Sequence, residues 1–298
     1  MRIAVTGAGG FCGSHVARAA AAAGAQVLCL GRRPGPLGQH LHWEATAPAS
    51  AELRAALRDC DLLVHCAAAV GDPRPGSPAE AESHAVNVAG AERLLAAAAG
   101  RPVVWVSSAS VYDPRPSRRL VREDHPTAGG HLNAYGRTKA AGERLALAAG
   151  AVVLRPRAVY GPGDPHLVPR LLARVRRGVL LLPGPDVELS LTAVQNLADA
   201  CLAAPGWAPG AYNIADPVPY RRDEAVRRVL RMHGVTDPVI RHLPLRAVRL
   251  AARAVPSAGL TPYAVDQLAH SVVLDTGRAR GQGWTPRWDL DTAFTTRV

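Results

Sequence analysis

The chain has 298 residues, enough for one large α/β unit or two closely joined domains. Its formal charge of +11 is spread along the chain without a basic block or a recognised nucleic-acid motif, so we expect no nucleic-acid partner. The sequence shows no signal-peptide pattern and no apolar run near the ~18–20 residues that cross a bilayer. Its five cysteines are scattered and lack the spacing of metal ligands. We therefore expect a cytoplasmic protein that binds neither membrane nor metal.

The first 155 residues alternate short apolar strands with alanine-rich helical segments. Apolar periodicity predicts strands at Arg2–Val5, Gln26–Leu30, Leu62–Cys66, Val103–Ser107 and Val152–Arg155, and helices at Phe11–Ala23, Ala85–Ala99 and Ala134–Ala149. Continuous apolar strands that alternate with helices are typical of a parallel sheet covered on both faces. The pattern therefore predicts an α/β fold with a doubly wound parallel sheet, the Rossmann arrangement.

Proline, glycine and arginine become more frequent after Pro156, and strand signals become sparse. We therefore assign residues 1–158 to a dinucleotide-binding Rossmann domain, with residues 192–215 expected to return to it. Residues 159–298 are assigned mainly to a smaller substrate-binding region. The segments PRPGSP (73–78) and DPRPSRR (113–119) are predicted to be loops.

A glycine-rich loop, TGAGGFCG, follows the first predicted strand and opens the first helix. Its glycines at 7, 10 and 13 allow a tight turn, close approach of the backbone to a pyrophosphate, and close packing of the helix on the strand. Because the loop stands within a βαβ unit, we interpret Gly7, Gly10 and Gly13 as part of a dinucleotide site.

The segment after the second strand indicates which dinucleotide is bound. An Asp or Glu about 20 residues past the loop usually meets a free ribose 2′-hydroxyl, but this chain has CLGRRPG there and no acid until Glu44. Arg32 and Arg33 can instead offer guanidinium groups to a 2′-phosphate. The sequence therefore favours NADP(H) over NAD(H), although two arginines in an arginine-rich chain could also simply be surface residues.

Tyr135 and Lys139 lie four residues apart, on one face of a predicted helix. Lys139 is the only lysine among the 35 Lys and Arg residues. A free tyrosine has a pKa of about 10, and we expect a nearby ammonium to lower it. A compact ammonium can also donate to ribose hydroxyls, which a planar guanidinium does poorly. We therefore interpret Tyr135 as an acid-base catalyst and Lys139 as its partner.

Three serines follow the strand that ends near residue 107, at the carboxyl edge where ligands bind in such sheets. The hydroxyl of Ser107, Ser108 or Ser110 could hydrogen-bond a substrate oxygen beside Tyr135, and chemistry alone does not choose among them.

Taken together, these segments resemble the extended short-chain dehydrogenase/reductase family, over nearly the whole chain. The resemblance rests on TGAGGFCG (6–13), DLLVHCAAA (61–69), NVAG (87–90), SSASVY (107–112), YGRTK (135–139), LRPRAVYGPGD (154–164) and AYNIAD (211–216), in the family's order. It implies Ser108, Tyr135 and Lys139 as catalytic residues, with Lys139 also holding the nicotinamide ribose, and a homodimer packed through helices of the cofactor domain. Further cofactor contacts are implied at Phe11, Cys12, Ala67, Ala68, Ala69, Asn87, Ser107, Pro156, Ala158 and Val159.

The chain departs from the family pattern at three places. Asp113 replaces a common glycine, Gln195 replaces a frequent acid, and Leu189 stands where sugar-nucleotide members often have an arginine for the diphosphate. The order of motifs is similar to the 3β-hydroxysteroid dehydrogenase-like and ketoreductase-like branches. We therefore expect an oxidoreductase that acts on a carbonyl or secondary alcohol of a small molecule. A nucleotide-sugar epimerase, dehydratase or deoxysugar 4-ketoreductase and a non-catalytic NADP(H) sensor are the alternatives.

Overall fold

The computed structural model describes residues 1–73, 76–113, 118–127, 133–254 and 261–295. Within them, a seven-stranded parallel sheet has the order β12-β7-β5-β4-β1-β2-β3. Its strands are β1 (Arg2–Thr6), β2 (Gln26–Gly31), β3 (Gln39–His42), β4 (Leu62–His65), β5 (Val103–Val106), β7 (Val152–Pro156) and β12 (Gly210–Ile214). This is the doubly wound order, which confirms the predicted fold class.

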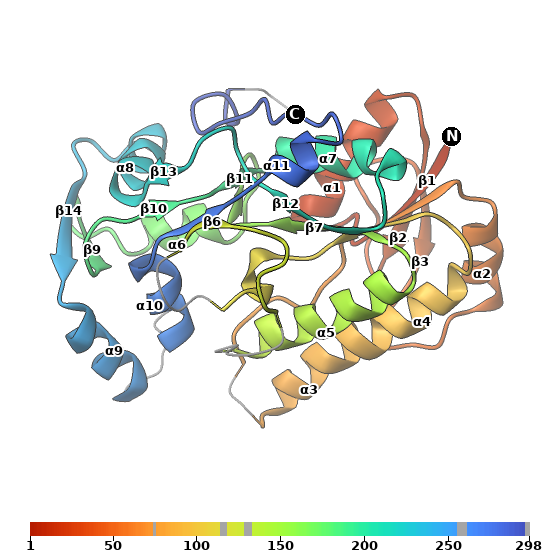
Figure 1. Ribbon diagram of the computed structural model, residues 1–298, viewed down its shortest axis with the longest axis horizontal. Coiled ribbons are helices and arrows are strands. Elements are labelled where there is room, and N and C mark those ends of the chain that lie inside the picture. The colour runs from red at the N-terminus through yellow and green to blue at the C-terminus, as the bar shows by residue number, and fades with distance from the viewer. Residues whose placement is uncertain (74–75, 114–117, 128–132, 255–260, 296–298) are drawn as a thin grey trace.

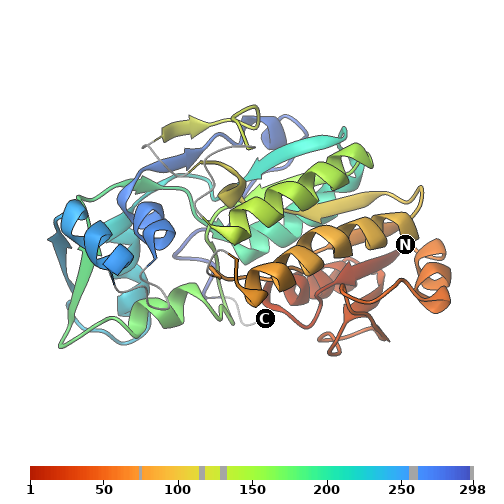
Figure 2. The ribbon, with the colours of Figure 1, turned by 90° about the horizontal axis from the view of Figure 1, so that it is seen from below.

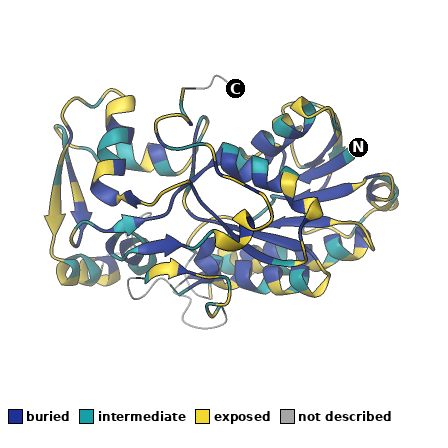
Figure 3. Ribbon diagram, turned by 45° about the horizontal axis from the view of Figure 1, so that its top comes forward, coloured by how far each residue is buried: buried dark blue, intermediate teal, exposed yellow. Residues whose placement is uncertain are grey.

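Helices cover both faces of this sheet (Figures 1 and 2). Apolar residues of one face pack under α1 (Phe11–Ala22), α7 (Val194–Ala203) and α11 (Gly277–Arg280). Those of the other face pack under α2 (Ala51–Arg58), α4 (Gly90–Ala97) and α5 (Ala134–Ala148). Because both faces are covered, β1, β4, β5 and β7 are almost continuously buried (Figure 3), which explains their unbroken apolar sequences.

The helix predicted at Ala85–Ala99 begins earlier than expected, at Pro78. It consists of α3 (Pro78–His84), a π-helical turn η1 (Ala85–Ala89) and α4. The Ser77 hydroxyl accepts from Glu80 N at 3.3 Å, while Glu80 Oε2 accepts from Gly76 N at 2.6 Å. This capping pattern, with proline in the first turn, starts a helix inside a segment that we predicted to be a loop. The rest of that loop prediction includes residues 74–75, which lie outside the described residues.

The C-terminal half, together with residues 118–121, contributes short strands that propensity did not reveal. They form a four-stranded sheet, β13-β10-β15-β6, and two parallel pairs, β11-β8 and β14-β9. The strands are β6 (Arg118–Val121), β8 (Val159–Tyr160), β9 (Val179–Pro183), β10 (Glu188–Leu189), β11 (Thr192–Ala193), β13 (Tyr220–Arg221), β14 (Val239–Leu243) and β15 (Val272–Leu274). The helices of this half are α6 (Leu167–Leu172), α8 (Arg222–Met232), α9 (Leu245–Ala254) and α10 (Pro262–Ala269), with a 3₁₀ turn η3 (Ala204–Gly206). Another 3₁₀ turn, η2 (Ala109–Val111), follows β5.

β6 begins within the segment predicted as a loop at 113–119, of which 114–117 lie outside the described residues. Five of the missed strands, β8, β10, β11, β13 and β15, have only two or three residues, which is too short to show alternation. No helix in the described ranges is long and apolar enough to cross a bilayer.

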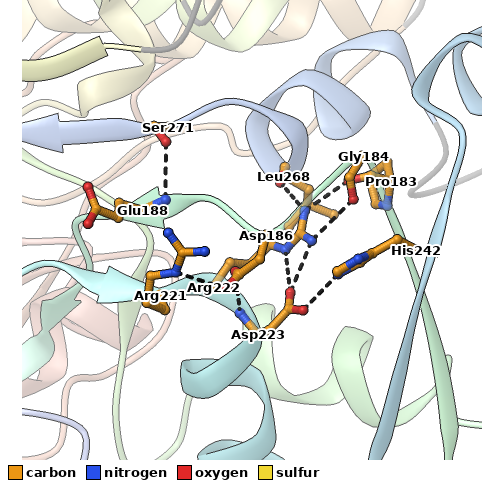
Figure 4. A network of polar contacts seen from close by, with 10 residues as sticks. All are labelled: Pro183, Gly184, Asp186, Glu188, Arg221, Arg222, Asp223, His242, Leu268 and Ser271. Carbon is orange, nitrogen blue, oxygen red and sulfur yellow. Dashed lines mark hydrogen bonds and ion pairs between the residues drawn. The ribbon is translucent and has the colours of Figure 1, made fainter.

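Arg222 connects four elements of this C-terminal half (Figure 4). Its side chain is only 1% exposed, and Nη1 donates to the carbonyls of Pro183 at 2.8 Å and Leu268 at 2.7 Å. Its Nε and Nη2 donate to Asp223, whose other oxygen lies 2.7 Å from His242 Nε2. The start of α8 is thus joined to β9, β14 and α10.

Candidate active site

The loop between β1 and α1 leaves no room for a side chain at Gly7 or Gly13. Gly7 has φ +67°, and a Cβ there would lie 2.9 Å from the Ala67 backbone. A Cβ on Gly13 would lie 2.3 Å from the Gly7 carbonyl oxygen. Gly10 caps α1 with no side-chain hydrogen bond. The first N–H groups of α1, at Phe11 and beyond, therefore face the loop at the positive end of the helix, a geometry that fits a pyrophosphate.

The turn after β4 closes this loop from the other side. Thr6 Oγ1 accepts from the backbone N–H groups of Cys66 at 3.1 Å and Ala67 at 3.2 Å. Asn87 Oδ1 accepts from Ala69 N at 2.8 Å, and Asn87 Nδ2 donates to Ala69 O and to Thr138 Oγ1, both at 3.0 Å. The Asn87 amide thus ties the turn of Ala67, Ala68 and Ala69 to α5.

Arg32 and Arg33 follow β2 on the same side of the sheet as the glycine loop. A Cβ on Gly9 would lie 3.3 Å from the Arg33 carbonyl oxygen, so the two segments are neighbours. Both arginine side chains are exposed, and neither forms an ion pair within the described residues. They are therefore available to an anionic group at the end of β2.

Ser108 and Tyr135 are brought together at the carboxyl end of β5. Ser108 starts η2, and its hydroxyl accepts from Ser110 N at 3.1 Å. The Ser108 side chain also lies beside the phenol of Tyr135 and favours its ionised form; Tyr135 stands in the first turn of α5. α5 begins there because Asn133 caps it, accepting from Gly136 N at 2.9 Å.

Lys139 lies one turn further along α5, with its ammonium buried. Its Nζ donates to the Val106 carbonyl oxygen at 2.7 Å. Burial lowers the pKa of Lys139 to about 8, while the nearby Glu143 carboxylate opposes that change. Cys12 of the glycine loop is close enough for Lys139 to affect its thiol. The glycine loop and the catalytic helix therefore meet at one place.

The expected lowering of the Tyr135 pKa by Lys139 is wrong for this structure. Burial raises the pKa of Tyr135 to about 12, and the neighbouring Ser108 side chain only partly opposes this rise. The physical reason is that the ammonium is directed to the Val106 carbonyl while the phenol loses contact with water. Tyr135 is consequently protonated at neutral pH, the state needed to donate a proton.

Ser107 has a different environment from Ser108. Its hydroxyl donates to Glu143 Oε2 at 2.5 Å, and its backbone N–H donates to Leu154 O. Glu143 in turn accepts from Arg155 Nε at 3.1 and 3.2 Å. The hydroxyl and the backbone N–H of Ser107 therefore both donate to other groups of the protein. The hydroxyl is not directed to the Tyr135 phenol.

The segment after β7 contains the last of the expected cofactor contacts. Pro156 is the final residue of β7, and Val159 begins β8. Ala158 between them is exposed and has φ +45°, which is unusual for a residue with a side chain. This strained turn stands at the carboxyl end of the sheet, next to β5 and its serines.

Sequence reasoning did not assign roles to Glu143, Arg155 or Tyr263. Glu143 could have been found from its spacing, since it lies four residues after Lys139 on the same helical face. Tyr135 lies close enough to raise the pKa of Tyr263, although 128 positions separate the two residues along the chain. No local pattern signals such a contact.

A Rossmann sheet with a glycine cradle and a Ser-Tyr-Lys group at its carboxyl edge defines a nicotinamide-dinucleotide-dependent oxidoreductase of the extended short-chain dehydrogenase/reductase type. The model of the NAD dependent epimerase/dehydratase family matches residues 3–215. The chain belongs to this family.

Named proteins show the same relationship. The chain is 30% identical to 2-alkyl-3-oxoalkanoate reductase of Shewanella oneidensis, over 80% of this chain and 68% of that protein. It is also 30% identical to 3 beta-hydroxysteroid dehydrogenase/Delta 5-->4-isomerase of Mycobacterium tuberculosis, over 99% of this chain and 88% of that protein. Among solved structures, MoeE5 in complex with UDP-glucuronic acid and NAD is similar, with a TM-score of 0.76, 26% identity, and coverage of 100% of this chain and 97% of that one.

Proposed function

We propose that the protein is an NADP(H)-dependent ketoreductase that interconverts a ketone and a secondary alcohol of a small organic substrate. The observation that carries the proposal is the pairing of the Ser108 and Tyr135 hydroxyls, with Lys139 on the same face of α5. Two hydroxyls at one point can hold the oxygen of a carbonyl, and a protonated phenol can act as its acid.

The chemistry of these residues follows from their protonation states. A bound dinucleotide would supply the hydride for the carbonyl carbon. Tyr135 donates its proton to the carbonyl oxygen, which leaves a tyrosinate and an alcohol. Ser108 hydrogen-bonds the same oxygen. Solvent then returns a proton to the tyrosinate, and Lys139, held on the end of β5, is the residue that would hold the nicotinamide ribose. The reverse sequence oxidises the alcohol.

The preference for NADP(H) rests on Arg32 and Arg33. Both are exposed at the end of β2 without a carboxylate partner in the described ranges, and no acid precedes Glu44. A 2′-phosphate would meet two guanidinium groups there, whereas a bare 2′-hydroxyl would lack its usual acceptor.

Both curated relatives are named for a ketone or a secondary alcohol as the reacting group, which supports the same substrate class here. A nucleotide-sugar epimerase or dehydratase is the second candidate, because MoeE5 was solved with a nucleotide sugar. Leu189 argues against it: this residue is 6% exposed within β10, where those enzymes often have an arginine. A non-catalytic sensor would not need the Ser108, Tyr135 and Lys139 set.

The test is NADPH oxidation with ethyl acetoacetate and methyl pentyl ketone as probes, using wild type and Tyr135→Phe. We expect turnover in wild type and a loss of about 10²–10⁴-fold in Tyr135→Phe, with NADPH affinity nearly unchanged. Tyr212→Phe is the matched control, since Tyr212 is buried in β12 and its hydroxyl donates to the Ala208 carbonyl. Full activity of Tyr135→Phe, or tightly retained NAD that does not exchange, would contradict the proposal.

The homodimer, the cytoplasmic location and the lack of a nucleic-acid or membrane partner stay predictions. Sedimentation of the purified protein at several concentrations would measure the first of them.

A further inference from the structure

Helix α10 of the C-terminal half is anchored beside the carboxyl end of β7 by a buried arginine. Arg157 follows β7 and is 6% exposed. Its Nη2 donates to the Gln267 carbonyl at 3.1 Å and to Gln267 Oε1 at 3.3 Å, while Nη1 donates to Ser190 O at 3.1 Å. Arg222 fixes the next residue, since its Nη1 donates to the Leu268 carbonyl (Figure 4). Two buried arginines thus hold one helix in place.

This anchoring brings Tyr263 to the active site. Tyr263 lies four residues before Gln267, so the two side chains share one face of α10. Its ionisable neighbours include Tyr135 and Arg157, and its hydroxyl faces that of Ser110. Burial raises the pKa of Tyr263, so its phenol is a neutral hydrogen-bond donor at every ordinary pH. A second phenol therefore stands near the catalytic one.

The hydroxyl of Ser110, which lies near Tyr263, is buried and lacks a hydrogen-bond partner among the described residues. Ser110 lies in η2, two residues after Ser108, and is 7% exposed. Its backbone N–H is used by the Ser108 hydroxyl, but its own Oγ has no hydrogen-bond partner among the described residues. Ser110 Oγ and the Tyr263 phenol lie near each other, but their contact does not meet hydrogen-bond geometry. A buried hydroxyl without a partner is rare and costly in a folded protein, which points to a ligand group that completes it.

We propose that Ser110 and Tyr263 form a second oxygen-binding subsite next to the Ser108–Tyr135 pair. The subsite takes the second oxygen of a 1,3-dicarbonyl substrate, that is, a 3-oxoacyl ester, thioester or acid. This inference rests on the proposed ketoreductase function and narrows its substrate class. Ser108 and Tyr135 hold the reacting carbonyl, while Tyr263 donates to the acyl carbonyl and Ser110 makes the second bond. A simple ketone leaves both groups of the subsite unpaired, and such sites discriminate strongly.

The experiment compares ethyl acetoacetate with methyl pentyl ketone, which has the same chain length and lacks the ester oxygens. We measure kcat/KM for each with NADPH in wild type, Tyr263→Phe and Ser110→Ala, with Tyr212→Phe as the control. The proposal predicts that the ester-over-ketone ratio of kcat/KM falls at least about tenfold in both variants, mainly through KM, and is unchanged in the control.

Equal losses on the two substrates, or an unchanged ratio in both variants, would overturn the subsite. A wild type that reduces neither compound would instead contradict the proposed function. In that case a ligand-binding experiment still tests the proposed subsite. With NADP+ present, ethyl acetoacetate must raise the melting temperature of wild type more than that of Tyr263→Phe, and an equal rise overturns the proposal.

Discussion

Glu143 and Arg155 form an ion pair that is almost completely buried, with side chains 2% and 4% exposed. Glu143 extends a row on α5 in which Tyr135, Lys139 and Glu143 follow at intervals of four residues. Each contacts one residue at the end of β5: Ser108, Val106 and Ser107, in that order. Arg155 continues the connection to the Tyr112 hydroxyl at 2.7 Å. The pair therefore sets the position of the catalytic helix against the strand that carries Ser108.

Replacing the charge of Glu143 should shift the pH dependence of the site. Burial already lowers the pKa of Lys139 to about 8, and the Glu143 carboxylate opposes that effect. The ammonium is present below this pKa and is lost as pH rises through it. In Glu143→Gln the opposing charge disappears, so the pKa of Lys139 falls further and the alkaline loss of cofactor binding begins at lower pH. We would measure the NADPH Kd from about pH 6 to about pH 10 by fluorescence.

Glu224→Gln is the control for this prediction, because Glu224 pairs with Arg228 at the surface of α8. Breaking a buried pair costs about 3–5 kcal/mol, so the melting temperature is recorded to define the range in which each variant is folded. An identical pH midpoint in folded Glu143→Gln and wild type would show that the carboxylate does not act on Lys139.

Lys139→Arg keeps the positive charge and changes only its shape. The Lys139 ammonium fits a buried position 2.7 Å from the Val106 carbonyl, which a planar guanidinium cannot reproduce. We expect kcat/KM to fall by about a hundredfold or more. Arg137→Lys is the matched control, since Arg137 is exposed on the same helix and pairs with Glu80. A loss of less than about threefold in Lys139→Arg would mean that charge alone suffices.

The double variant Arg32→Ala, Arg33→Ala should lose the preference for NADPH. Two charge-assisted contacts to a phosphate together account for about tenfold to a hundredfold in affinity. We expect the Kd for NADPH to rise by that factor and the Kd for NADH to change little, as measured by fluorescence titration. Arg54→Ala removes an exposed arginine of α2 and serves as the control. If wild type already binds NADH at least as tightly as NADPH, the arginines are surface residues only.

Gly13→Ala should damage the glycine cradle. The added Cβ would lie 2.3 Å from the Gly7 carbonyl oxygen, so α1 must move away from the loop. We expect a loss of ~1–3 kcal/mol in the free energy of unfolding and at least a tenfold weaker NADPH complex. Gly206→Ala is the comparison, because a Cβ there meets no atom within 4 Å. We would measure thermal unfolding and NADPH titration of both variants. Equal stability and equal NADPH affinity of the two variants would exclude close packing as the role of Gly13.

The sequence by itself determined the Rossmann fold, the glycine loop and the spacing of Tyr135 and Lys139. These signals are local: apolar periodicity, glycine at fixed intervals, and a helical repeat of four residues are properties of neighbouring positions. The choice among the three serines came from the family resemblance. Short strands of the C-terminal half were missed, and most of them have only two or three residues, which show no alternation.

The tertiary structure alone decided which partners these residues meet. It placed the Lys139 ammonium on a carbonyl, used the Asn87 amide to hold a turn, and brought Tyr263 beside Tyr135. Such contacts depend on how separate elements pack, and the bond between Arg157 and Gln267 joins residues 110 positions apart. Burial of the assembled site, rather than any residue's neighbours in the chain, raises the pKa of Tyr135 and lowers that of Lys139.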